Sequence, residues 1–499
     1  MAELEVWMRV GQPFEPLLAD QERILDAWQS GGVRGLVLGR LAFMTEYPEE
    51  PEGPEDGEAS DVGAESEGAP PVAPAPSWGG NRSGTVAAFS PNHTVYRRWG
   101  VEPPPDPEQT FPRRRERLTQ LLDSVKRRGW PIYIFEPAAG MGPPAPGLPG
   151  AGGPLITDEG RRRAYLARLE DTVSQFPQVD GVILDGPEWG YEIAPGHRSD
   201  LFQDLPEAVE PAAQALGFDY GRLVGARDRL NQRLHKLSRE VATLSAGGGV
   251  FSGLSLIGND PGIVSWFTFR SRALTAFYRH VHALAEALTR ARGRQVKLGI
   301  GPRMPAFSAL CGYDLPAIAP LFDLILPKLY IWDRGFDGLY GTVRRYMETL
   351  MDWNPGLWEP EAFNAVRALL GISLPAAEPD ARPGQPMAAL RELERGFPDA
   401  FFREVMTNEV RRSIAAADGY PWKMLPWIDT GRRPHAGDPV TAHDLRRLLL
   451  ATKEGGARHF LYHNHGHLTA AEWSVISEYC GTAWRAGQGL YGQYLPPDG

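Results

Sequence analysis

Three carboxylic acids stand at, or just after, the ends of short apolar stretches of the sequence. Asp185 closes the run GVIL, Glu188 follows three residues later, and Asp429 follows Pro-Trp-Ile. Tryptophans accompany them, because Trp189 is adjacent to Glu188 and Trp427 precedes Asp429 by two residues. Cleavage of a glycosidic bond needs one carboxylic acid to protonate the leaving oxygen and one carboxylate to attack or to activate water. Tryptophan packs against the C–H faces of sugars. The pattern therefore predicts catalytic roles for the three acids.

Other polar and aromatic residues close further apolar runs or follow them closely. We expect them to bind substrate: Glu136, Trp189, Glu192, Arg303, Lys328, Tyr330, Trp332, Asp333, Trp427, His463, Asn464 and His465. A Lys or Arg beside an acid can hold that acid ionised or bind an anionic substituent. No cofactor and no metal ion is predicted for this site.

Several of these acids also have structural interpretations. An Asp at a strand end caps the turn that follows, which is the alternative for Asp185. Glu188 and Glu192 are alternatives for the role of Asp185, and one of the two could equally be a loop-surface residue. Asp333 competes with Asp429, but its sequence WDRGFDG is also good turn chemistry, and we rank Asp429 slightly ahead.

The histidines in YHNHGH, residues 462–467, allow a metal hypothesis. Histidine is a common metal ligand, and alternation along a strand would place His463 and His465 on one face. With Glu136 and Asp185 they would form the site of a metal-dependent sugar isomerase or hydrolase. No HExxH or CxxC pattern accompanies them, and Asn with His at a barrel rim also binds sugar hydroxyls, so we favour the sugar-binding interpretation.

The pair Asn408-Glu409 resembles the acid/base motif of many retaining glycosidases. It lies in FFREVMTNEVRRSIAAA, whose apolar residues recur at helical spacing. The pattern therefore predicts a glutamate within a helix, facing an arginine, and no catalytic role.

Eight short β-type runs alternate with longer amphipathic stretches. The runs cover residues 4–10, 35–41, 132–136, 181–185, 296–300, 323–331, 423–429 and 459–463. The helices are expected at about 18–30, 109–128, 159–175, 207–245, 263–292, 338–370, 386–416 and 441–453. This alternation predicts an α/β chain, residues 1–499, folded as one (β/α)8 TIM barrel.

A doubly wound open sheet is the alternative fold, and the helix signal between residues 302 and 321 is weak. The C-terminal ends of barrel strands share a common mouth, which would gather the candidate residues.

Two Pro- and Gly-rich segments interrupt this pattern after β-type runs. Residues 46–84 have almost no large apolar side chain and are predicted to be a disordered loop insertion. Residues 137–153 form a shorter Pro/Gly-rich loop. The ten acids in residues 46–67 account for the whole net charge of −10, so no basic field remains to hold nucleic acid.

The remaining composition is that of a soluble globular chain, with 42% hydrophobic and 23% charged residues. No apolar run approaches the roughly 18 residues of a membrane span, and the N-terminus lacks the basic and apolar regions of a secretory signal. We therefore expect a cytoplasmic protein with a carbohydrate substrate and no membrane partner. Cys311 and Cys480 are too few for a disulfide framework and are predicted to lie in the core.

The stretch VDGVILDGPEWGYE, residues 179–192, is similar to the DG-x-x-x-D strand of glycoside-hydrolase-type TIM barrels, including poorly characterised glycosidase groups. The later order of VKLGIGPR, DLILPKLYIW, PWIDTG and FLYHNHG is similar too, so the resemblance covers most of the chain outside the two insertions. It implies a glycan hydrolase with its carboxylate at the fourth strand, on Asp185 or Glu188. The chain departs from the better-known patterns of such barrels. It lacks the D-x-x-D-x-D-x-E array of chitinase-type barrels, and it has Asp429 where other barrels have a seventh-strand Glu.

The resulting hypothesis is hydrolysis of a glycosidic bond in an oligo- or polysaccharide. Asp185 would be the nucleophile or base, and Glu188 or Asp429 would supply the proton, held neutral by burial against tryptophan. The metal-dependent enzyme and a carbohydrate-binding barrel without catalysis are the alternatives.

Overall fold

A computed structural model describes most of the chain. The described residues are 4–11, 15–39, 90–103, 112–138, 155–194, 201–203, 205–244, 256, 259–330, 339–370, 399–428, 442–463, 465 and 468–485. The predicted disordered insertion at 46–84 and nearly all of the loop at 137–153 lie outside them.

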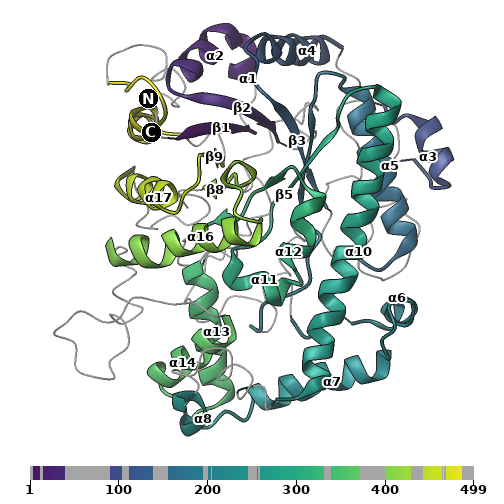
Figure 1. Cartoon of the computed structure of the whole chain (residues 1–499), viewed down its shortest axis with the longest axis vertical. Helices are drawn as coiled ribbons and strands as arrows, with labels where there is room; N and C mark the ends of the chain where they lie inside the picture. Colours follow the sequence, from purple (N-terminus) through teal and green to yellow (C-terminus); the bar gives the residue numbers. More distant parts are fainter. Residues whose placement is uncertain are drawn as a thin grey trace, which may run out of the picture.

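The core of the fold is a parallel sheet with nine described strands (Figure 1). The strands are β1 (Glu5–Val10), β2 (Val33–Leu38), β3 (Ile132–Pro137), β4 (Gly181–Asp185), β5 (Lys297–Ile300), β6 (Leu324–Ile325), β7 (Lys328–Leu329), β8 (Trp427–Ile428) and β9 (His459–Tyr462). Their order is β6-β5-β4-β3-β2-β1-β9-β8-β7. Most of their residues are buried, as expected for a parallel sheet covered on both faces.

The strands β6 and β7 are two halves of one extended stretch, separated by two residues. On one edge, the N–H of Leu326 donates to the carbonyl of Ile300 at 2.7 Å. On the other edge, the carbonyl of Pro327 accepts from the N–H of Trp427 at 2.9 Å. Proline has no N–H, so Pro327 interrupts the ladder while its carbonyl still bonds. The two ends of the strand order therefore meet in this stretch and close a ring of eight strand positions, which confirms the TIM-barrel-like prediction.

Helices surround the sheet at the positions that the sequence predicts. They include α2 (Gln21–Ser30), α4 (Pro112–Arg127), α5 (Glu159–Gln175), α10 (Pro261–Arg292), α16 (Thr407–Ala416) and α17 (Ala442–Glu454). Their ends have local causes. Asp260 caps α10 by accepting from the N–H of Gly262 at 2.8 Å, and a hydrogen bond from Arg229 lowers the pKa of Asp260 to about 2. Gly293, with φ 63°, ends the helix in the left-handed conformation.

Several expected helices differ in detail. The stretch 207–245 is broken into a short 3-10 turn (Glu207–Val209), α6 (Glu210–Ala215), α7 (Tyr220–Leu234) and α8 (Arg239–Leu244). The stretch 338–370 divides into α13 (Leu339–Trp353) and α14 (Glu359–Leu370). The described part of 386–416 is helical from residue 399, with a π-helical segment, η5 (Phe401–Met406), before α16. The described helices outside the expected ranges include α3 (His93–Trp99) and α18 (Ala470–Cys480).

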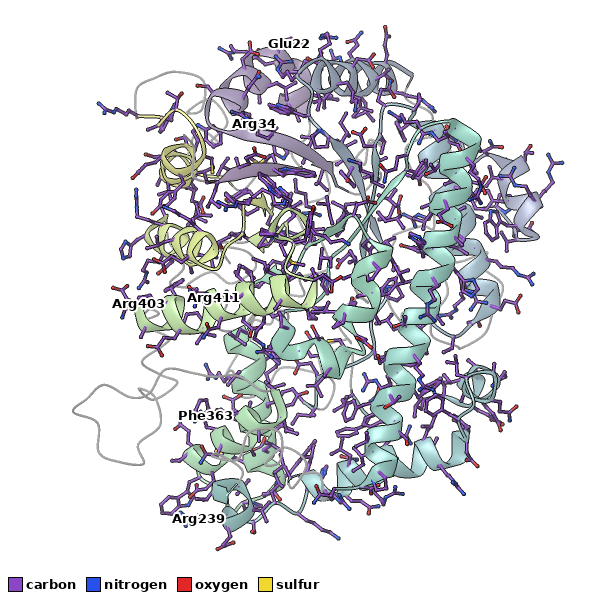
Figure 2. All side chains as sticks on the ribbon, in the orientation of Figure 1. Glu22, Arg34, Arg239, Phe363, Arg403 and Arg411 are labelled. Atoms are coloured by element: carbon purple, nitrogen blue, oxygen red, sulfur yellow. The ribbon has the colours of Figure 1, made fainter. Side chains whose placement is uncertain are left out.

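Helices that follow β4 and β7 extend the molecule beyond the barrel. In Figure 1, α6, α7, α8, α13 and α14 lie at its lower end. Asn354, just after α13, accepts from the N–H of Leu237 at 2.9 Å and donates to the carbonyl of Leu234 at 2.7 Å. Figure 2 shows Arg239 and Phe363 at this end, opposite Glu22 and Arg34. The extension is therefore tied together at the junction of α7, α8 and α13.

Two glycines lie against large aromatic rings in the barrel. A Cβ on Gly35 would stand 2.3 Å from the ring of Trp7, so no other residue fits there without a shift. Gly301 faces Trp427, whose ring would be 3.5 Å from an added Cβ. Cys311 and Cys480 are free and buried, which confirms that they are core residues. Within the described residues, none of the helices is both long and apolar enough to cross a bilayer.

His459 begins β9 inside this aromatic packing. Its side chain is 4% exposed, and its ring lies 5.8 Å from Trp7 and 5.7 Å from Trp422 between centroids. Burial lowers the pKa of His459 to about 4, because a charged ring would lose its hydration there.

We predict a pH-dependent stability that His459→Gln removes. The folded pKa lies below the unfolded value of 6.5, so the unfolded state takes up the proton first as the pH falls. The free energy of unfolding of the wild type is then expected to fall by about 2 kcal/mol relative to the variant between pH 7 and pH 5. Urea unfolding of both proteins at pH 5, 6 and 7 measures this difference. Parallel pH dependences would show that His459 is not held neutral.

Candidate active site

An ion pair joins two strand ends across the mouth of the barrel. Lys328 lies in β7, and Asp185 is the last residue of β4. Nζ of Lys328 is 2.6 Å from Oδ1 of Asp185. The Lys328 side chain is 5% exposed and that of Asp185 is 28% exposed. The acid that closes the apolar run GVIL thus faces a buried cation and remains accessible to a ligand.

Aromatic side chains surround this pair. Nζ of Lys328 lies 5.8 Å from the ring centroid of Trp427, and the ring of His463 stacks on Trp427 at 5.3 Å and 27°. The hydroxyl of Tyr330 is 3.4 Å from Nδ1 of His463. The guanidinium of Arg9 lies 5.7 Å from the Trp427 ring on another side. We call these six residues the mouth group: Arg9, Asp185, Lys328, Tyr330, Trp427 and His463.

A second ion pair lies in the loops after β4 and β5. Nε of Arg303 donates to Oε1 of Glu188 at 2.7 Å, and its Nη2 is 2.6 Å from the same oxygen. The hydroxyl of Tyr313 donates to the other carboxylate oxygen at 3.3 Å. Tyr278 stacks on Tyr313, and burial raises the pKa of both phenols, so they stay hydroxyl donors. Glu188 is thus engaged through both of its oxygens.

The loop that carries Glu188 is held by the helices around it. The hydroxyl of Tyr278, in α10, donates to the carbonyl of Pro187 at 2.8 Å. The indole N–H of Trp189 donates to the carbonyl of Arg270 at 2.8 Å, and the Trp189 side chain is fully buried. Trp189 therefore anchors the loop in this structure, and its indole is not exposed at the mouth.

Two predicted acids point away from the mouth group. Glu136 pairs with α5, where Arg168 is 3.0 Å from Oε2 and the Thr172 hydroxyl donates to Oε1 at 3.0 Å. Glu192 pairs with Arg345 of α13 at 2.6 Å. Burial raises the pKa of Glu192, and the charge of Arg345 opposes this shift. Both acids connect the sheet or its loops to covering helices.

The histidines of the metal hypothesis do not converge. His465 accepts at Nδ1 from the N–H of Gly11 at 3.2 Å, whereas His463 contacts Tyr330 and Trp427. Glu136 contacts α5. In the parts of the chain that the structure describes, no group of three His, Cys, Asp or Glu side chains could hold a metal ion. The geometry therefore offers no support for the metal-dependent alternative.

Four predicted residues lie outside the described part of the chain: Trp332, Asp333, Asp429 and Asn464. Their roles stay predictions. Asp429 directly follows β8, whose Trp427 belongs to the mouth group.

The sequence analysis missed two residues at these pairs, Arg9 and Tyr313. Arg9 is a charged residue within the apolar run LEVWMRV and is 4% exposed. A charged residue inside an apolar strand is costly to bury without a partner, and this is the signal that could have identified Arg9. Tyr313 carries no such signal, because its contact with Glu188 depends on the fold of the fifth connection.

The prediction that Glu409 lies within a helix and faces an arginine is confirmed. Glu409 lies in α16, where Arg412 donates to its Oε1 at 2.6 Å, and its Oε2 accepts from the N–H of Ala306 at 2.9 Å. Its side chain is buried, and it connects α16 to the start of α11 (Pro305–Cys311).

Comparisons with known proteins give no match to a protein-family model and no match among curated sequences. Among solved structures, the chain is similar to a β-galactosidase from the psychrophilic Marinomonas ef1, with a TM-score of 0.43, 12% identity, and coverage of 96% of this chain and 59% of that one. It is similar to a glycoside hydrolase family 18 N-acetylglucosaminidase from Paenibacillus barengoltzii, with a TM-score of 0.33, 11% identity, and coverage of 72% and 86%. A third is the chitinase ChiW from Paenibacillus sp. str. FPU-7, with a TM-score of 0.34, 9% identity, and coverage of 74% and 27%.

These three structural neighbours are glycoside hydrolases. The chain spans 59% of the length of the β-galactosidase. TM-scores below 0.5 carry no argument about fold or activity, so both have to be inferred from the chain's own residues.

The Glu188–Arg303 pair yields a stability prediction. Replacing Glu188 by Gln removes the charged partner of a guanidinium that is 2% exposed, which should cost about 2 kcal/mol of unfolding free energy. The double variant Glu188→Gln/Arg303→Met should cost at least about 1 kcal/mol less than the sum of the single variants. Urea unfolding of the four proteins closes this cycle.

The matched control is Glu348→Gln, which breaks a more exposed pair with Arg344 at 2.8 Å. It should change the free energy of unfolding by at most about 0.5 kcal/mol. Additive single variants at Glu188 and Arg303 would contradict a coupled, buried pair.

Proposed function

We propose that the chain hydrolyses a glycosidic bond in an oligo- or polysaccharide. The observation that carries the proposal is the accessible carboxylate of Asp185, 2.6 Å from Lys328, at a barrel mouth with aromatic walls. Barrel enzymes bind substrate at this end of the strands, and sugars pack their C–H faces on aromatic rings.

Asp185 is the proposed nucleophile or base. Lys328 places a positive charge against the carboxylate and holds its position, since the ammonium group is nearly enclosed and has little room to move. The side chain of Asp185 is 28% exposed, so the carboxyl group can contact a sugar carbon or a water molecule. The role of nucleophile or base needs a carboxylate at this position.

Asp429 is the proposed proton donor, ahead of Glu188. Both oxygens of Glu188 already accept hydrogen bonds from Arg303 and Tyr313, so a proton carried there would have to replace one of these contacts. Glu188 and Arg303 are better suited to position the loop after β4. Asp429 stands directly after β8, beside the mouth group in sequence.

Sugar hydroxyls would be bound by the polar tips of the mouth group. His463 is partly buried and stacks on Trp427 beside the Asp185–Lys328 pair. Tyr330 orients that ring through Nδ1. Trp332, Asp333 and Asn464 are proposed to complete the substrate contacts.

The test compares Asp185→Asn with Asp180→Asn. Asp180 is an acid at the opposite end of the same strand, and it also pairs with a lysine, Lys126, at 2.8 Å. Asp185→Asn should reduce kcat/KM by on the order of 10³-fold or more, whereas Asp180→Asn should leave it within a few-fold. The measurement is reducing-sugar release from cellulose, xylan, mannan, galactan, starch and chitin, each with and without EDTA.

Retention of activity by Asp185→Asn would overturn the assignment. Loss of wild-type activity with EDTA would favour the metal-dependent enzyme. Glycan binding without any release by the wild type would indicate a carbohydrate-binding barrel that has no catalytic activity.

A further inference from the structure

The connection between β5 and β6 lacks a long covering helix. Its elements are α11 (Pro305–Cys311), α12 (Leu315–Ile318) and a 3-10 turn (Ala319–Leu321), whereas the neighbouring connections supply α10 with 32 residues and α16 with 10. A hollow of about 790 Å³ lies beside this short connection. One wall is the C-terminal half of α10, and the other is the turn between α16 and β8. The short connection between β5 and β6 accounts both for the weak helix signal in residues 302–321 and for this hollow.

The hollow has an apolar floor and polar walls. Val296, Leu298 and Phe322 form the floor at the start of β5 and before β6. The polar lining residues are His282, Glu286, Thr289, Arg290, Gln295, Asp323, Asp418 and Lys423. Acidic and basic groups are mixed, with three carboxylates against two cations and one histidine. A neutral ligand with many hydroxyl groups fits this lining better than a polyanion or a polycation does.

Two aromatic side chains stand at the edge of the hollow with most of their surface in solvent. Tyr420 is 66% exposed and Trp422 is 54% exposed. The turn that presents them is fixed: Gly419, with φ 75°, donates its N–H to the carbonyl of Ile414 at 2.9 Å. The Trp422 ring also packs edge-on against His459 at 5.7 Å. Trp422 is therefore held in place while most of its surface remains in solvent.

Large aromatic rings held in solvent beside a polar hollow favour a sugar ligand. Apolar surface left in water is unfavourable, and a ligand that covers this surface recovers the free energy. The C–H faces of pyranose rings cover aromatic rings, and their hydroxyls need both donors and acceptors. The walls of this hollow supply donors in Arg290 and Lys423 and acceptors in Glu286 and Asp418.

The hollow is at the opposite end of the strands from the mouth group. Val296 and Lys297 lie at the start of β5, whereas Asp185 is the last residue of β4, and the two strands are parallel neighbours. A sugar bound in the hollow is therefore separated from Asp185 by the length of the barrel.

We propose that this hollow is a second carbohydrate-binding site, which holds a neutral segment of the same polysaccharide that is cleaved at the mouth. The proposal rests on the proposed function for the choice of ligand. Tyr420 and Trp422 are the contact surface, and the polar walls bind hydroxyls.

The test uses full-length Tyr420→Ala/Trp422→Ala, with Trp358→Ala as the matched control. Trp358 is 63% exposed but lies next to α14, in the helical extension. Binding to insoluble cellulose, xylan, mannan, galactan, starch and chitin is measured by depletion in the Asp185→Asn background. Hydrolysis of the same polymers and of short aryl glycosides is measured with Asp185 present. Melting temperatures check that each variant is folded.

The double variant should bind the polymer at least tenfold more weakly and cleave it more slowly, with unchanged turnover of the aryl glycoside, and Trp358→Ala should match the parent. The proposal is overturned if the double variant binds like the parent, if Trp358→Ala loses as much, or if the parent binds none of the polymers. Failure of the proposed function has a different signature, namely no turnover of any substrate by the wild type, whether or not binding depends on Trp422.

Discussion

The interrupted strand from Leu324 to Leu329 is the constraint on which the rest of the structure depends. It gives hydrogen bonds to β5 on one edge and to the β8 region on the other, so the first and last halves of the chain form one ring. Pro327 has no N–H to donate, but its own carbonyl accepts a hydrogen bond from the N–H of Trp427 in β8. This closure carries Lys328 across to Asp185. An open sheet would leave these two residues at distant edges, with no reason to form an ion pair.

Two ion pairs and the hydrogen bonds that hold the loop after β4 then fix the positions of the side chains at the barrel mouth. Lys328 and Arg303 are nearly enclosed, and each has a carboxylate within 2.6 Å. Enclosed charges of this kind are tolerated only in good geometry, which makes the positions of Asp185 and Glu188 rigid. The loop after β4 gains further restraint because Tyr278 and Trp189 bond to the backbone or to the neighbouring helix. Chemistry at this mouth would therefore occur on a preorganised set of groups and not on a flexible rim.

The sequence was sufficient for the ring of strands and for part of the site. All eight predicted runs contain or overlap observed strands, and Asp185, Lys328, Tyr330, Trp427 and His463 do meet. The sequence did not predict on which face of the sheet each strand-end residue lies. Parallel barrel strands are buried on both sides, so their runs lack the alternation that would separate Phe135, which contacts Trp427, from Glu136, which contacts α5. The burial of Trp189 depends on α10, which is about 80 residues distant in sequence, and no local pattern reports it.

The same geometry separates two kinds of surface along the barrel. Acids at strand ends gather at one end because every parallel strand finishes there, whatever the lengths of the connecting helices. The other end is shaped by the connections themselves, and a hollow of about 790 Å³ lies beside the short fifth connection, at the start of β5. Polar side chains from α10 and the turn before β8 occupy the margins of that gap, while Tyr420 and Trp422 remain in solvent although the turn is rigid. A packing defect would be expected to have only apolar side chains around it, so the polar walls and the exposed rings of Tyr420 and Trp422 are better explained by a ligand.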